Sequence, residues 1–253
     1  GASLGAPASA NGTITNDDST TVSISPLNAA QLEGATGTTK SFTFTVSLSN
    51  PSDFETTVQV DTANGTATAG EDYTPIVAQG LTFLPGQTSK TVTVTVSGDA
   101  TVEADETFTV ALSGVHGTGA SLGAPASANG TITNDDAATI SINDVAASEA
   151  SGQISFTLTL SQAVAEDVTV VVNTADLAPA EALAGTDYTA RTAQTVTFTA
   201  GGALTQSFVV TVANDAIVEN NERLAVNLSD ARFAGAADAT RLTIGDPQGT
   251  GTI

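Results

Sequence analysis

Two stretches of the chain carry three acidic residues at one spacing, an Asp followed by Glu four and seven residues later. They lie within residues 97–108 and 213–224, and each stretch separates two runs in which apolar and polar residues alternate. Carboxylates this close repel one another unless a cation lies between them. Ca²⁺ suits such a loop best because it takes six to eight oxygen ligands. The residues concerned are Asp99, Glu103 and Glu106 in the first stretch and Asp215, Glu219 and Glu222 in the second.

The overall charge is consistent with cation binding and excludes several other partners. The 253 residues include 27 Asp and Glu against 6 Lys and Arg, a net charge of −21. Such a surface repels nucleic acid and anionic membranes and attracts divalent cations. No apolar run is long enough to span a bilayer, so we expect no membrane insertion in this segment. A single His, the absence of Cys and the lack of a nucleophile–base pair argue against an enzyme.

The chain is built from a repeat of about 116 residues. Residues 1–18 recur letter for letter at 119–136, and Glu33 and Glu149 occupy matching positions 116 residues apart. We therefore expect three parts: residues 1–18 as the last strand of a preceding repeat, 19–136 as one domain, and 137–253 as a second. The second domain stops before the acidic residues that would end its repeat, so we expect a piece of a longer chain with an incomplete second site.

Period-two alternation of apolar residues predicts seven short strands in each repeat, and no stretch shows a helical period. Turn residues such as Asn64-Gly65 and Pro85-Gly86 separate the strands. This pattern predicts an all-β fold of two tandem seven-stranded antiparallel β-sandwiches of the immunoglobulin-like kind. In the complete repeat the predicted strands are 20–25, 41–49, 57–62, 81–83, 90–96, 107–112 and 129–133.

Strand direction determines where the acidic residues lie. If the first strand runs toward one pole, then the loops after the first, third and fifth strands and the end of the seventh share that pole. The acidic loops and the acidic end of the repeat fall in these places, so we expect the carboxylates to converge there. That convergence destabilises the fold unless cations neutralise it.

Several ordered motifs give the repeat a resemblance to a known family. Glu33-Gly34, the stretches 65–73 and 81–87, the Asp99 loop and residues 130–136 resemble the Calx-beta domain, which occurs in sodium–calcium exchangers and in long bacterial surface proteins. The resemblance implies Ca²⁺ ligands at Glu33, Asp72, Asp99, Glu103, Glu106, Asp135 and Asp136, with the Thr101 carbonyl. In the second repeat it implies Glu149, Asp187, Asp215, Glu219 and Glu222, with the Ile217 carbonyl.

Two departures from the densest exchanger-like sites predict fewer ions or weaker binding. Gly98 and Asn214 stand where those sites carry one acid, and Asn134 stands where they carry another. We expect dissociation constants of ~10⁻⁵ to 10⁻³ M.

Three functional interpretations follow. The favoured one is a calcium-binding structural repeat of a long extracellular surface protein, such as an adhesin, biofilm or filament protein, in which Ca²⁺ stiffens head-to-tail joints between neighbouring repeats. The alternative is a regulatory calcium sensor of a larger membrane protein. The third is an enzyme or a sugar-binding module, which the lack of a nucleophile–base pair and the scarcity of aromatic residues argue against. The acidic tips themselves could also be solvated loops of a generally acidic protein, but their clustering and repetition favour cation binding. Residues 1–18 are either disordered or donated as a strand to another copy of the chain.

Overall fold

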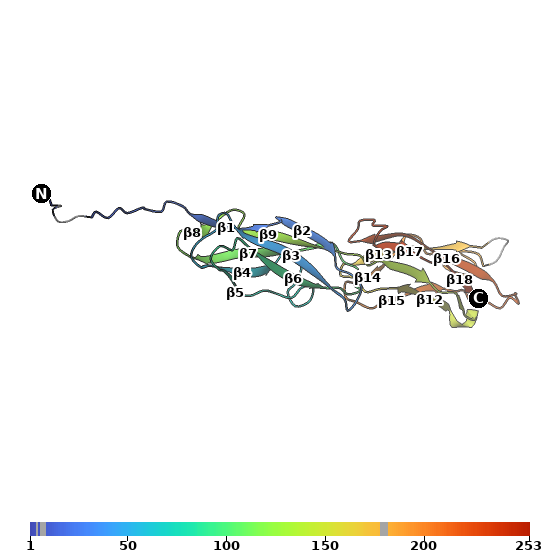
Figure 1. Cartoon of the computed structure of the whole chain (residues 1–253). Coiled ribbons are helices and arrows are strands. Elements are labelled where there is room, and N and C mark those ends of the chain that lie inside the picture. The colour runs from blue at the N-terminus through green and yellow to red at the C-terminus, as the bar shows by residue number, and fades with distance from the viewer. Residues whose placement is uncertain (4, 6–8, 178–181) are drawn as a thin grey trace. The chain divides into compact units, whose positions relative to one another are not determined.

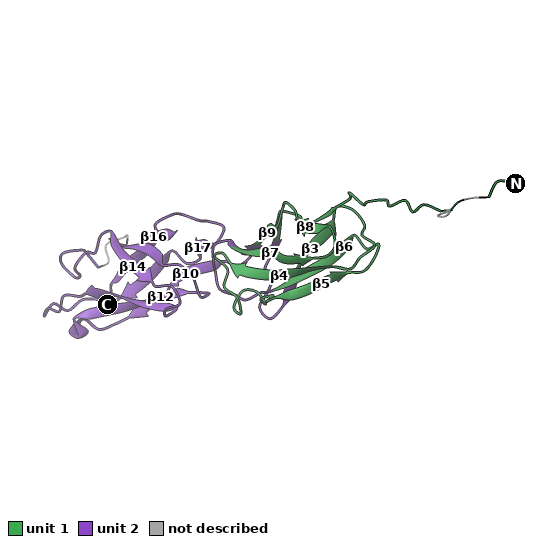
Figure 2. Ribbon diagram, turned by 90° about the vertical axis from the view of Figure 1, so that its left-hand side faces the viewer, with its two compact units in different colours: residues 1–30, 41–95, 107–131 green, residues 31–40, 96–106, 132–253 purple. Residues whose placement is uncertain are grey.

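The computed structural model describes residues 1–3, 5, 9–177 and 182–253, and nearly all of their regular structure is β-strand (Figure 1). Contacts between residues divide the chain into two compact units (Figure 2). The first consists of residues 1–30, 41–95 and 107–131, and the second of residues 31–40, 96–106 and 132–253.

The first sandwich consists of two facing sheets. One has the strand order β6-β3-β1-β8, formed by Ser89–Ser97, Thr39–Leu48, Thr20–Ser25 and Ala120–Leu122. The other has the order β2-β9-β7-β4-β5, formed by Asn28–Leu32, Ser127–Thr133, Glu106–His116, Thr56–Asn64 and Gln79–Phe83.

Alternating apolar residues build the core between these sheets. In β3, Phe42, Phe44 and Val46 are fully buried while the residues between them face outward. The ring of Phe108 on β7 lies edge-on to Phe42 at 5.3 Å and stacks on Tyr73 at 4.9 Å. The period-two pattern of the sequence is therefore the pattern of burial.

The second sandwich repeats this arrangement. One sheet has the order β15-β12-β10-β17, formed by Thr205–Thr211, Gln153–Leu160, Ala138–Ile142 and Leu242–Ile244. The other has the order β11-β18-β16-β13-β14, formed by Val145–Ala146, Gln248–Thr252, Arg223–Phe233, Val168–Asp176 and Gln194–Phe198.

The β-sandwich prediction is confirmed, but the strand count differs: among the described residues each sandwich has nine strands instead of seven. The first and last strands of each repeat are each divided between the two sheets. In the first sandwich β8 pairs in parallel with β1, whereas β9 lies in the other sheet beside β2. Segments such as β2 are short and mostly exposed. They bury no regular apolar face, so alternation could not reveal them.

The described part of residues 1–18 forms no strand in this chain; residues 4 and 6–8, which fall in the predicted strand, lie outside the described residues. Ile14 is 99% exposed, whereas Ile132, its counterpart in the identical stretch, is buried in β9. No helix among the described residues is long and apolar enough to cross a membrane.

Candidate metal sites

Three carboxylates meet at the loop end of the first sandwich. Glu33 follows β2, and Asp135 and Asp136 follow β9. The two strands are sheet neighbours, and the Glu33 N–H donates to the Thr133 carbonyl at 3.1 Å. This pairing brings together residues about a hundred positions apart, with one oxygen of each carboxylate within 4.8 Å of the others.

This group contains buried charge that the described residues leave unpaired. Glu33 is only 4% exposed, and no described residue donates a hydrogen bond to its Oε1 or to Oδ2 of Asp136. Burial, followed by repulsion from Asp99 and Glu103 and then from Asp136 and Asp135, raises the pKa of Glu33 to about 8. Burial raises the pKa of Asp136 too, with Asp135 and Asp99 adding to it. Buried carboxylates without donors are costly, and a coordinated cation supplies the missing partner.

The β6–β7 loop lies beside this group. Asp99 closes a tight turn in which its Oδ1 accepts a hydrogen bond from the Thr101 N–H at 2.6 Å. Its charge acts on Glu33 and Asp136, although it is not one of the three converging carboxylates. Ligation by Asp99 and by the Thr101 carbonyl stays a prediction.

A second group of three carboxylates within 4.8 Å of one another consists of Asp72, Glu103 and Glu106. Asp72 lies in the turn between β4 and β5, where its Oδ2 accepts a hydrogen bond from the Thr68 N–H at 2.6 Å. The next residue, Tyr73, is buried, and its hydroxyl donates to Asn64 Oδ1 at 2.7 Å. Tyr73 is thus a packing residue that supports the turn.

Backbone contacts explain why Gly98 carries no acid. Its N–H donates to the Thr38 carbonyl at 3.0 Å, and its carbonyl accepts from Gly37 at 3.1 Å. A Cβ at this position would lie 2.0 Å from the Gly34 carbonyl oxygen, so there is no room for a side chain.

Asn134 acts as a clamp between loops. Its Oδ1 accepts a hydrogen bond from the Glu103 N–H at 3.1 Å, and its Nδ2 donates to the Asp136 carbonyl at 2.8 Å. The Asn134 N–H in turn donates to Asp105 Oδ1 at 3.2 Å. Sequence reasoning missed these roles of Asn134 and Asp105, because a side chain that bonds a distant backbone leaves no spacing signal.

The second sandwich carries two overlapping groups with Glu219 common to both. One contains Glu149 and Asp215, the other Asp187 and Glu222, and the carboxylate oxygens within each group lie within 4.8 Å of one another. The structure therefore brings together all five acidic residues predicted for this repeat. The Ile217 N–H donates to Asp215 Oδ1 at 2.7 Å, the same turn as in the first repeat.

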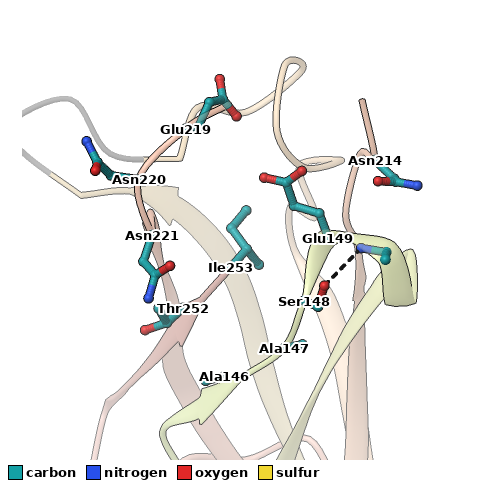
Figure 3. A pocket seen from close by; sticks show the side chains of 11 residues that line it. Ala146, Ala147, Ser148, Glu149, Asn214, Glu219, Asn220, Asn221, Thr252 and Ile253 are labelled. Atoms are coloured by element: carbon teal, nitrogen blue, oxygen red, sulfur yellow. Dashed lines mark hydrogen bonds between the residues drawn. The ribbon is translucent and has the colours of Figure 1, made fainter. Parts of the chain in front are cut away.

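Glu149 begins a short 3₁₀ helix, Glu149–Ser151, capped by Ser148, whose Oγ accepts from the Ala150 N–H at 3.3 Å. Glu149 and Glu219 both line the open pocket shown in Figure 3. Partial desolvation, and then the charges of Asp215, Asp187 and Glu149, raise the pKa of Glu219. These groups are more exposed than Glu33, so the second tip presents its carboxylates at a more open surface.

The acidic tips can hold hard divalent cations through carboxylate oxygens. The Calx-beta domain profile matches the chain twice, at residues 15–136 and 133–250. A search among curated proteins found no match.

Three solved structures of Calx domains are among those similar to this chain. CBD12 from CALX1.2 is 17% identical, with a TM-score of 0.42, over 91% of this chain and 98% of that one. The calcium binding domain CBD12 of CALX1.1 is 17% identical, with a TM-score of 0.40, over 92% and 99%. The apo form of the Calx CBD1 domain is 24% identical, with a TM-score of 0.41, over 47% and 100%.

Proposed function

Because the chain belongs to the Calx-beta family, whose domains bind Ca²⁺, we propose that its two domains are calcium-binding structural repeats of a long extracellular surface protein, such as an adhesin, biofilm or filament protein. The observation that carries the proposal is the group of Glu33, Asp135 and Asp136, which holds buried carboxylate oxygens without a hydrogen-bond donor among the described residues.

The residues that would hold Ca²⁺ at the first tip are Glu33, Asp135 and Asp136 in one group and Asp72, Glu103 and Glu106 in the other. At the second tip they are Glu149, Asp187, Asp215, Glu219 and Glu222. Bound Ca²⁺ supplies positive charge among these oxygens. The chain itself contributes the loop turns and the Asn134 clamp that hold the oxygens in place before the ion arrives.

The structural role rests on the position of the first tip in the sequence. Asp135 and Asp136 immediately precede β10, which begins at Ala138, so almost no linker separates the metal ligands from the next domain. Calcium bound there ties the acidic loops together and stiffens the joint. Tandem repeats, with residues 1–18 recurring letter for letter at 119–136, favour a role in an array.

A regulatory calcium sensor in a larger membrane protein is the second candidate. The wide exposure of the second tip favours it, because a more open site exchanges its ion more readily. In that case Ca²⁺ would change the shape of the two-domain chain reversibly at signalling concentrations, and not merely stabilise it.

Titration of the whole chain with Ca²⁺, with sedimentation and melting temperature recorded together, tests the proposal. We expect the melting temperature to rise as Ca²⁺ is added. We expect the frictional ratio to change as the joint stiffens and then to stay constant once the sites are saturated. An unchanged melting temperature and an unchanged frictional ratio at millimolar Ca²⁺ would contradict it.

A further inference from the structure

The β6–β7 loop carries an apolar side chain that is buried outside its own sandwich core. Residues 96–106 belong by their contacts to the second unit. Within that unit Val102 is fully buried and joins the core cluster that contains Val164. Its N–H donates to the Ala163 carbonyl at 2.9 Å, and its carbonyl accepts from the Ala165 N–H at 3.1 Å. Val102 is therefore fixed to residues 163–165 by its own buried side chain and by two backbone hydrogen bonds. We call Val102 the plug and residues 163–165 its socket.

The second repeat has the same loop with its plug uncovered. Val218 occupies the position of Val102, three residues after Asp215 as Val102 is after Asp99. Both loops make the same Asp-to-backbone turn. Val218 is 99% exposed and the preceding Ile217 is 66% exposed. Two adjacent exposed aliphatic side chains at the tip of an acidic loop form an apolar surface of the kind that binds a partner.

The first sandwich has a socket of the kind that receives Val102. The segment 163–165 that accepts Val102 is held by a hydrogen bond from the Gly201 N–H to the Val164 carbonyl at 2.9 Å. In the first sandwich the Gly86 N–H donates to the Ser52 carbonyl at 2.9 Å, so Ser52 takes the place of Val164. The two socket loops share this anchor and the same length between their flanking strands.

The socket of the first sandwich is uncovered in the described chain. No described residue accepts from the Asp53 N–H or donates to the Pro51 carbonyl, the two groups that correspond to the partners of Val102. Phe54, which is 58% exposed, lines a pocket together with Pro51, Ser52 and Asp53, and residues 16 and 18–20 of the same chain line the pocket as well. Its ring supplies apolar surface beside Ser52, which is more polar than Val164.

We propose that residues 217–218 of one chain dock on residues 51–54 of a second copy, with the Val218 N–H donating to the Pro51 carbonyl and the Val218 carbonyl accepting from the Asp53 N–H. The two surfaces differ, so the contact is head to tail, and its repetition builds an open filament of chains. The contact needs only the loop geometry and therefore goes beyond the proposed calcium role.

The charges at both surfaces determine when the contact forms. Asp215 and Glu219 flank the plug, and the socket contains Asp53 and is followed by Glu55, so two acidic surfaces approach each other. Salt or bound divalent cations weaken this repulsion. A contact built on one short loop is small, and we expect weak, concentration-dependent association.

Disulfide trapping tests the contact cleanly because the chain contains no cysteine. Val218→Cys in one chain and Ser52→Cys in a tagged second chain are mixed and oxidised, both in EDTA and in Ca²⁺. The matched control replaces Val218→Cys by Val77→Cys, since Val77 is 79% exposed and lies outside the plug loop. A single chain with Val102→Cys and Val164→Cys, which form a β-bridge, serves as the positive control.

We expect the Val218→Cys pair to give several-fold more mixed dimer than the Val77→Cys pair in at least one of the two ion conditions. Equal yields in both conditions overturn the proposal. A noncovalent version compares sedimentation at rising concentration: Val218→Asp should abolish self-association and Val77→Asp should leave it unchanged. Failure of the calcium proposal would instead appear as a melting temperature that does not change on addition of Ca²⁺. The yields of mixed dimer do not depend on that measurement, so the two failures can be told apart.

Discussion

Glu33 is the acidic residue of the first tip whose ionised form is most strongly destabilised in the folded chain. Burial of its carboxyl, followed by repulsion from four other acidic residues, raises its pKa to about 8. A group of this kind takes up a proton when no cation is bound and loses it when one binds. Protonation and calcium are therefore alternative ways of making the same fold tolerable.

Removing this charge should stabilise the metal-free chain. Glu33→Gln keeps the shape of the side chain but has no charge to bury, so in EDTA at pH 8 we expect a free energy of unfolding about 1–2 kcal/mol higher than wild type. The same variant should show a smaller gain in melting temperature on addition of Ca²⁺. Glu71→Gln, at an exposed acid outside the groups, is the matched control. A Glu33→Gln variant that is less stable than wild type in EDTA would count against the interpretation.

The pH dependence follows from the direction of the same shift. The pKa of Glu33 is higher in the folded chain than its ordinary value of 4.5, so its contribution to stability is present below that value and is lost as the pH rises toward 8. Denaturant unfolding in EDTA should therefore show stability falling between about pH 5 and pH 8. Calcium affinity should rise over the same range, because binding requires the deprotonated carboxyl. Stability that rises with pH in EDTA, in wild type and Glu33→Gln alike, would exclude this role of Glu33.

At the scale of elements, the site depends on the close approach of the loops as well as on the acids they carry. Gly98 lies against the Gly34 carbonyl at the point where the β6–β7 loop passes the loop after β2. Asn134 ties the β6–β7 loop to the segment after β9. These contacts fix the separation of carboxylates that belong to different loops.

Gly98→Ala should disrupt this approach because its Cβ would overlap the Gly34 carbonyl oxygen. We expect a loss of about 1–3 kcal/mol in the free energy of unfolding, together with weaker calcium binding at the first tip. Gly80→Ala is the control, since nothing lies within 4 Å of a Cβ there. Equal unfolding free energies for the two variants would show that the loops do not meet in this way.

The elements that sequence could predict are those with a regular apolar face. Strands β3 and β7 alternate over nearly their whole length, and strand direction then placed their loops at one pole, so convergence of Glu33 with Asp135 could be predicted. Strand β2 and the 3₁₀ helix of Glu149 could not, because neither buries a regular apolar face. The lack of room at Gly98 was also invisible, because it depends on a backbone contact more than sixty residues away.

At the scale of the whole molecule, a charge of −21 on 253 residues opposes any compact arrangement of acidic loops. Simple screening by salt acts on exposed charges and reaches buried ones much less. A cation coordinated as proposed would act directly on the buried group at Glu33.

Calcium should therefore stabilise the chain beyond the effect of ionic strength. We expect millimolar CaCl₂ to raise the melting temperature more than NaCl of equal ionic strength, and more than MgCl₂, because Mg²⁺ demands a strict octahedral shell and keeps its waters. Scanning calorimetry in the three salts measures the difference. Equal effects of the three salts on the melting temperature would indicate that the acidic tips are solvated loops that coordinate no ion.

The most direct test is an isothermal calorimetric titration of the chelator-stripped chain with Ca²⁺, run beside the double variant Glu33→Gln, Glu149→Gln. We predict saturable binding to the wild-type chain with dissociation constants of ~10⁻⁵ to 10⁻³ M, and clearly weaker binding or fewer ions for the double variant. A wild-type chain that binds no calcium at millimolar concentration, or a double variant that binds it equally well, would contradict the convergence of these carboxylates on a metal.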